Sequence, residues 1–300
     1  MMNNRFEKQN EEYMLKCLFA QRQEYSVAKK MNNITLFLVI LSVVFAVLTA
    51  RFDDPLLLAV SNMAAVFIIV ANKYIDKKVV VLKKSGASLQ QYFDAHFFSY
   101  ILGRDLLIWS NIPNQTDVDR KIANIHSTDT SKERNWYSDY SKLDEEQQVF
   151  CCQVQNVEWD IKLRKVYEQI IIILGVLSLC IIFFALRDFT VLKMINIIAL
   201  IVPLIEYNIN IVVSVRKDIN RLKKIEERQK LVEKRLNDTN VDKKQKHAML
   251  SNLQDCIMEN RIEATLIPDR FYSLMQKRYQ EYEDRVAKNI TDRADKGSSR

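Results

Sequence analysis

Residues 150–186 read FCCQVQNVEWDIKLRKVYEQIIIILGVLSLCIIFFAL and combine two kinds of surface in one uninterrupted segment. The first half is polar with the spacing of an amphipathic helix, and the second half, from residue 170, is almost wholly apolar. No proline lies between Pro113 and Pro203, and Gly175 is the single glycine in that interval. Because proline and glycine are the residues that interrupt helices, we predict one helix through both halves. A ligand bound to the polar half would then act directly on the apolar half.

The apolar residues of this 300-residue chain are concentrated in four runs, at positions 34–50, 55–75, 170–186 and 191–215. At about 1.5 Å per helical residue, each run is roughly long enough to cross a hydrocarbon core of about 30 Å. A soluble helical bundle is the alternative, but uncharged apolar runs of this length are hard to place in a small soluble core. We therefore predict an all-α membrane protein with four transmembrane helices in two hairpins.

The remaining segments are polar enough to form a helical cytosolic part. The predicted division is an N-terminal cytosolic helix at 1–33, a transmembrane hairpin at 34–76, a central cytosolic domain at 77–166, a second hairpin at 167–215 and C-terminal cytosolic helices at 216–300. Within the central domain, we expect helix at 85–102 and from 143 onward. A polar, turn-rich stretch separates them at 110–131.

The charge distribution predicts how these spans are oriented. The two short predicted turns, at 51–55 and 187–189, carry at least as many acids as bases. Basic residues instead flank the opposite ends of the spans: Lys77, Lys78, Lys83, Lys84, Lys162, Arg164, Lys165, Arg216, Lys217, Arg221, Lys223 and Lys224. By the positive-inside rule, both termini and the central domain are expected in the cytosol. Almost nothing is then exposed outside, so any input signal comes from the cytosolic side.

The composition argues against an enzyme, a metalloprotein or a nucleic-acid-binding protein. Four glycines leave no Gly-rich phosphate loop, and the five cysteines lack the CxxC spacing of zinc or redox sites. The three histidines are scattered, and no set of nucleophile, acid and base stands out. Charge in the central domain is nearly balanced, so neither DNA nor RNA is an expected partner. We expect no catalytic residue, no metal and no cofactor.

Candidate ligand-binding residues lie on the polar half of the opening stretch. Cys152, Asn156, Trp159 and Leu163 share one helical face, and Asp160, Arg164 and Tyr167 lie beside it. An amide, an indole and a guanidinium on one face can stack a nucleobase and hold a phosphate. The same face is equally suited to a buried polar contact between helices.

Few polar residues interrupt the predicted spans. Glu206 follows Pro203, where a helix loses a backbone hydrogen bond and can kink. A carboxylate at membrane depth is costly unless it is paired or hydrated, so Glu206 is a candidate pore or gating residue. The alternative is a Glu near the cytosolic interface that bonds to a neighbouring helix. Asn62 and Asn196 are further pore candidates, although Asn within spans more often mediates helix packing.

Short motifs placed around these spans resemble a known family. They are Asn135-Trp136-Tyr137; Cys152-Gln153-x-x-Asn156-x-x-Trp159-Asp160-x-x-Leu163-Arg164-x-x-Tyr167, running into a span; Gln21-Arg22 with Tyr25, Ala28 and Lys29; Phe93-Asp94 with Trp109; and Ile267-Pro268-Asp269 with Phe271 and Tyr272. In order and placement, over about residues 8–285, they resemble the SMODS-associated four-transmembrane effector family.

This resemblance implies an effector of bacterial antiphage systems of the cyclic-oligonucleotide (CBASS) type. A partner synthase would make a cyclic di- or trinucleotide on infection, and the cytosolic part would bind it. A homo-oligomer in the bacterial inner membrane would then breach the lipid bilayer. The candidate contacts to base or phosphate are Trp136, Tyr137, Gln153, Asn156, Trp159 and Arg164. The competing hypotheses are a constitutive small ion channel or transporter, and a membrane scaffold that recruits a protein partner.

Overall fold

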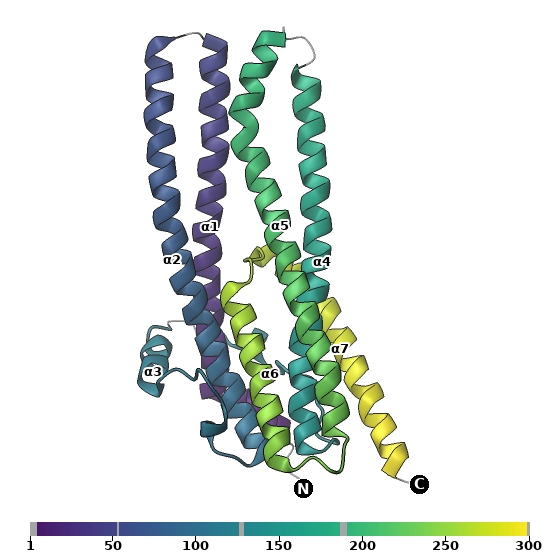
Figure 1. Cartoon of the computed structure of the whole chain (residues 1–300). Helices are drawn as coiled ribbons and strands as arrows, with labels where there is room; N and C mark the ends of the chain where they lie inside the picture. Colours follow the sequence, from purple (N-terminus) through teal and green to yellow (C-terminus); the bar gives the residue numbers. More distant parts are fainter. Residues whose placement is uncertain (1–4, 53, 126–128, 187–190, 299–300) are drawn as a thin grey trace.

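The computed structural model describes residues 5–52, 54–125, 129–186 and 191–298, and every regular element in these ranges is helical. Four long helices run side by side along the molecule: α1 (Glu12–Phe52), α2 (Pro55–Leu102), α4 (Glu145–Leu186) and α5 (Val191–Leu236) (Figure 1). The shorter elements gather around one end: η1 (Arg5–Asn10), η2 (Leu106–Ile108), α3 (Gln115–Ala123), η3 (Ser131–Glu133), α6 (Lys243–Glu263) and α7 (Asp269–Ser298). The predicted all-α class is confirmed.

The predicted continuous helix of the opening stretch is also confirmed. α4 runs without interruption from Glu145 to Leu186. α1, α2 and α5 are of similar length, with 41, 48 and 46 residues, and all four long helices run along most of the molecule (Figure 1). All four predicted boundaries between cytosolic and membrane segments therefore fall inside continuous helices rather than in loops.

Local sequence explains where several helices begin and end. The Asp54 side chain accepts a hydrogen bond from the Leu56 backbone N–H at 2.9 Å, and Pro55 occupies the first turn of α2. Gly103 ends α2 with a φ of 59°, a left-handed conformation that glycine adopts without strain. Asp242 caps α6, because its side chain accepts a hydrogen bond from the Gln245 backbone N–H at 2.7 Å.

The stretch 110–131, predicted to be rich in turns, contains the nine-residue helix α3. Asn114 caps this helix by accepting a hydrogen bond from the Thr116 backbone N–H at 2.9 Å. Val118 is buried, and Ile122, one turn further on, packs against the same core, so α3 has a narrow apolar face. The Asn114 cap and this two-residue apolar face are the local signals for the helix.

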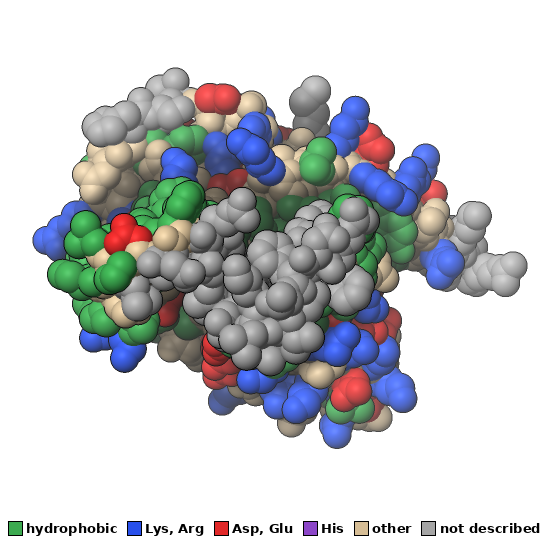
Figure 2. Space-filling view, turned by 90° about the horizontal axis from the view of Figure 1, so that it is seen from above, with side chains coloured by type: hydrophobic (Ala, Val, Ile, Leu, Met, Phe, Trp, Pro, Cys, Tyr) green, Lys and Arg blue, Asp and Glu red, His purple; other side chains and the backbone are tan. Residues whose placement is uncertain are grey.

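Each long helix changes character along its length. In α2, Phe93 and Phe97 are fully buried in the core around the short helices, whereas Met63 and Phe67 in the other half are 75% and 70% exposed. Seen down the long axis, hydrophobic side chains gather at the left of the view, on the side of α1 and α2, while Lys and Arg side chains lie around the rim (Figure 2). An exposed apolar surface of this extent is typical of a membrane or protein contact.

Within the described residues, one helix, α2, holds a stretch that is long and apolar enough to cross a membrane. The four-span arrangement stays a prediction. The first predicted turn falls between the end of α1 at Phe52 and the start of α2 at Pro55. Asp53 and the second predicted turn, at 187–189, lie outside the described residues.

Candidate functional site

A network of buried polar side chains crosses the core where α2, α4 and α6 meet. Asp94 of α2 is fully buried, and its Oδ1 accepts a hydrogen bond from the Tyr137 hydroxyl at 2.6 Å. Its Oδ2 accepts from Gln254 Nε2 at 2.9 Å and lies 2.6 Å from Arg261 Nη1. Buried charge is tolerated when it is paired and hydrogen-bonded in this way. We call this set the Asp94 network; it comprises Gln91, Asp94, Tyr137, Gln153, Asn156, Gln254 and Arg261.

Three predicted ligand residues, Tyr137, Gln153 and Asn156, are brought together in the Asp94 network. Asn156 Nδ2 donates to the Tyr137 hydroxyl at 2.6 Å. Gln153 Nε2 donates to Gln254 Oε1 at 3.1 Å and to the Leu250 carbonyl at 2.9 Å. Burial and the nearby Asp94 carboxylate raise the pKa of Tyr137 well above its usual range. Its hydroxyl therefore keeps its proton and remains a donor at neutral pH.

Arg164, a fourth predicted residue, lies further along α4 in a second group of buried charges. Its Nη1 is 2.8 Å from Asp218 Oδ2 and donates to the Thr265 carbonyl at 3.0 Å, and its Nε is 2.9 Å from Asp160 Oδ1. Asp218 Oδ2 also accepts from the Thr265 backbone N–H at 2.7 Å. Arg164 and Asp218 thereby hold the connection between α6 and α7 against α4 and α5.

Trp159, a fifth predicted residue, faces α7 rather than the Asp94 network. Its ring centroid is 6.1 Å from that of Tyr272 and 5.7 Å from that of Tyr279. Lys29 Nζ lies 5.6 Å from the Tyr272 ring centroid and 2.7 Å from Asp269 Oδ1. We call Lys29, Trp159, Asp269, Tyr272 and Tyr279 the Trp159 cluster. Trp136, the sixth predicted residue, is half-buried against the main core.

The candidate pore residues lie in the other half of the long helices. Asn62 on α2 and Glu206 on α5 are both exposed on the single chain. Asn196 also belongs to α5, but its side chain lies outside the described residues. Exposure of an amide and a carboxylate next to apolar surface is unfavourable in lipid. Both side chains would need a polar partner there.

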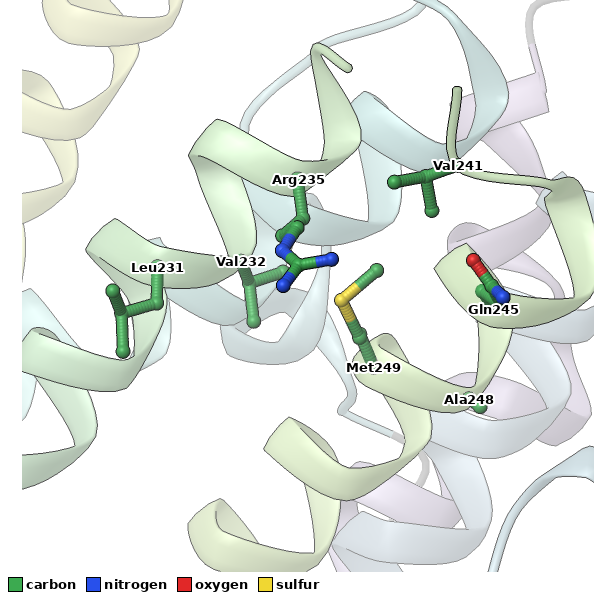
Figure 3. Close-up of a pocket in the computed structure, with 7 residues that line it drawn as sticks. All are labelled: Leu231, Val232, Arg235, Val241, Gln245, Ala248 and Met249. Atoms are coloured by element: carbon green, nitrogen blue, oxygen red, sulfur yellow. The ribbon is translucent and has the colours of Figure 1, made fainter. Parts of the chain in front are cut away.

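The structure also contains a groove of about 500 Å³ between the end of α5 and the start of α6 (Figure 3). Its lining consists of Leu231, Val232, Arg235, Val241, Gln245, Ala248 and Met249. None of the predicted site residues lines this groove, and no aromatic ring is available there to stack on a base. The groove therefore does not resemble a nucleotide site.

Sequence reasoning did not single out Arg261, Gln254 or Asp218. Each is a polar residue on a helix rich in polar residues, so the sequence alone gives no sign that it is buried. Among the described residues, no group of three His, Cys, Asp or Glu side chains is arranged to hold a metal ion. Burial raises the pKa of the Cys151 thiol to about 12, so this thiol is a poor nucleophile at neutral pH.

Comparison with known proteins identifies the family. No curated protein and no solved structure matches the chain. One family model, described as the SMODS-associating 4TM effector domain, matches residues 3–290, which is nearly the whole chain. The chain therefore belongs to the SMODS-associating 4TM effector domain family.

Proposed function

We propose that the protein is a signal-gated membrane effector of antiphage defence. Its cytosolic part binds a cyclic di- or trinucleotide, and its membrane part then permeabilises the bacterial inner membrane. Family membership supports an effector role beside a synthase that makes the signal. The observation that carries the gating is the continuity of α4, which joins Asn156, Trp159 and Arg164 to the exposed apolar residues Ile173 and Leu177.

The membrane part in this proposal consists of four spans in two hairpins, with both termini in the cytosol. The extensive packing of α1 on α2 and of α4 on α5 supports the two hairpins. The exposed apolar halves of these helices favour lipid around them, and the Lys and Arg residues at one end favour a cytosolic location for that end.

Six residues are the proposed contacts to a base or phosphate: Trp136, Tyr137, Gln153, Asn156, Trp159 and Arg164. Tyr137, Gln153 and Asn156 already have partners inside the Asp94 network, so a ligand that contacts them replaces a protein partner. Such an exchange alters how α2, α4 and α6 pack. A ligand shifts this equilibrium only through a difference in its affinity for the two arrangements.

The proposed active form is a homo-oligomer. Four packed helices in one protomer enclose no sizeable water-filled path, so a pore requires several copies. The exposure of Asn62 and Glu206 supports this idea, because contact between copies would remove both side chains from lipid. Asn196 is the third residue proposed to line such a path.

The test is dye release from proteoliposomes that contain the full chain. Cyclic di-AMP, cyclic di-GMP, cyclic GMP–AMP and cyclic tri-AMP are added separately, with AMP and linear di-AMP as controls. We expect release with at least one cyclic nucleotide, together with a rise in melting temperature for the same compound. No release and no thermal shift with any of them would reject the proposal.

The competing hypotheses give different results in the same assay. A constitutive channel releases dye without nucleotide, and Glu206→Gln changes that resting release. A scaffold releases no dye under any condition. A protein that responds only to the cyclic compounds matches neither alternative.

A further inference from the structure

The Trp159 cluster forms where helices that are far apart in sequence meet on one side of the bundle. Trp159 belongs to α4, Tyr272 to the first turn of α7, and Lys29 to α1. The planes of the Trp159 and Tyr272 rings are tilted by 37°, and Tyr279 meets the indole edge-on at 77°. Two ring faces and one ammonium group therefore lie within a few ångströms of one another.

The indole of Trp159 has an unused hydrogen-bond donor. Its Nε1 is buried and has no hydrogen-bond partner among the described residues. Buried indole N–H groups normally find an acceptor, because burial removes the water that would otherwise accept this bond. Ring nitrogens and carbonyl oxygens of nucleobases, as well as phosphate oxygens, are acceptors of this kind.

A base that stacks between the Trp159 and Tyr272 rings has to separate them. A base between two rings needs about 7 Å, twice the roughly 3.4 Å separation of stacked bases in DNA. The centroids of Trp159 and Tyr272 are 6.1 Å apart and the rings are tilted by 37°, so the two rings pack on each other here and must move apart to admit a base. Burial and nearby Asp160 raise the pKa of Tyr272, so this ring remains neutral beside an anionic ligand.

Lys29 can exchange its present partner for a phosphate. Its side chain is 17% exposed and pairs with Asp269, whose side chain is 48% exposed. An ion pair with one half-exposed member is weak, because water and salt compete for it. A phosphate can take the place of the Asp269 carboxylate beside the Lys29 ammonium. Because Asp269 is half-exposed, the displaced carboxylate can turn to solvent and is not left buried without a partner.

We propose that Trp159 and Tyr272 hold a base of the cyclic nucleotide between their rings while Lys29 binds the adjacent phosphate. This inference rests on the proposed function and adds Lys29 and Tyr272 to its site. A ligand held in this way joins α1, α4 and α7. Because α1 and α4 both continue into the apolar half of the molecule, the ligand would couple the two hairpins.

The experiment measures nucleotide binding to the full chain in nanodiscs, using each of the four cyclic nucleotides as the probe. We expect Tyr272→Leu to weaken binding about tenfold or more through loss of one stacking face. Lys29→Gln also weakens binding, and it makes log Kd depend less on log salt, because one charge contact to a phosphate is lost. Base stacking quenches the fluorescence of Trp159, so Trp159→Phe removes that quenching.

Two variants control for general damage to α7. Tyr282 lies on the same helix, with its ring centroid 3.7 Å from Lys162 Nζ. We expect Tyr282→Leu to bind within about twofold of the wild type, because it lies outside the Trp159 cluster. Tyr272→Phe, which keeps the ring, should also bind normally.

The outcomes separate this inference from the proposed function. If the wild type binds a cyclic nucleotide and both Lys29→Gln and Tyr272→Leu bind it as tightly, the site is wrong and the function stands. If Tyr282→Leu loses as much affinity as Tyr272→Leu, the stacking assignment is overturned. If the wild type binds none of the four compounds, the proposed function fails and the inference fails with it.

Discussion

Glu133, in η3, is an almost fully buried acid with one ionic partner. Arg22 Nη1 lies 2.8 Å from its Oε1, while its Oε2 has no hydrogen-bond partner among the described residues. Burial raises the pKa of Glu133, and the opposing effect of Arg22 is smaller. The ionised carboxylate is therefore less favourable in the folded protein than in the unfolded chain.

Replacing this carboxylate should stabilise the protein in a pH-dependent way. The loss of folding stability caused by ionising the buried Glu133 carboxylate is absent below the unfolded pKa of about 4.3. It grows as the pH rises towards the folded pKa of Glu133 and is constant above that pKa. We expect Glu133→Gln to melt at a higher temperature than the wild type at pH 7, with the difference shrinking towards pH 4. Thermal unfolding of the detergent-solubilised protein at both values measures this effect.

Glu145 provides the matched control, because it pairs with Arg5 at 2.7 Å and both side chains are partly exposed. Exposed pairs contribute roughly 0–1 kcal/mol, so Glu145→Gln should change the melting temperature little at either pH. A lower melting temperature for Glu133→Gln at pH 7 would mean that the Arg22 pair outweighs burial.

At the scale of the elements, α1 and α2 are pressed together beside the Trp159 cluster. Gly86 of α2 is buried, and a Cβ placed there would lie 3.1 Å from ring carbons of Tyr25 on α1. Such a contact is closer than ordinary packing allows, so a side chain would force the two helices or the ring to shift. Glycine at this position fixes how closely the first pair of long helices approaches.

Gly86→Ala should destabilise the protein, and Gly175→Ala should not. Both substitutions stabilise the helix by up to about 1 kcal/mol, because alanine has a higher helix propensity than glycine. At Gly86 this gain is opposed by overpacking, which typically costs about 1–3 kcal/mol. A Cβ at Gly175 of α4 would have no neighbour within 4 Å among the described residues. Melting temperatures of the two variants provide the comparison, and a Gly86→Ala protein as stable as Gly175→Ala would show that α1 and α2 adjust freely.

At the scale of the whole molecule, the long helices divide it into a half with a packed core and a half with an apolar exterior. Phe67 lies in the first half of α2 and Leu231 near the end of α5, and both side chains are similarly exposed. The start of α2 and the end of α5 lie in opposite halves of the molecule (Figure 1). In water the two positions would be equivalent. In the proposed membrane arrangement, Phe67 faces lipid and Leu231 faces the cytosol.

Phe67→Lys should therefore impair membrane insertion, and Leu231→Lys should leave it unchanged. A lysine at the centre of a span costs about 2.5–3.5 kcal/mol on insertion scales. A lysine on the exposed cytosolic surface should change the stability of the protein by no more than the roughly 0.5 kcal/mol typical of surface substitutions. Carbonate extraction of membranes that express each variant measures the inserted fraction. Equal insertion of both variants would contradict the assignment of α2 as a span.

Much of the secondary structure could be predicted because it depends on neighbouring residues. The absence of proline between Pro113 and Pro203, with Gly175 as the single glycine there, predicted an uninterrupted α4. Helix α3 was missed because it is only nine residues long and its narrow apolar face, Val118 and Ile122, lies in a mostly polar stretch. The Asn114 cap marks where α3 begins, but the polar composition of the stretch indicated a loop.

The sequence by itself determined long helices with a polar half and an apolar half, because helix formation and hydrophobic patterning are local. Only the tertiary structure decided which polar residues meet. Arg261 pairs with Asp94 across 167 positions, and Lys29 reaches Asp269 across 240. Three-dimensional packing, rather than sequence spacing, set these contacts. It placed Tyr137, Gln153 and Asn156 in one network and Trp159 in another, although Gln153, Asn156 and Trp159 lie within two turns of α4.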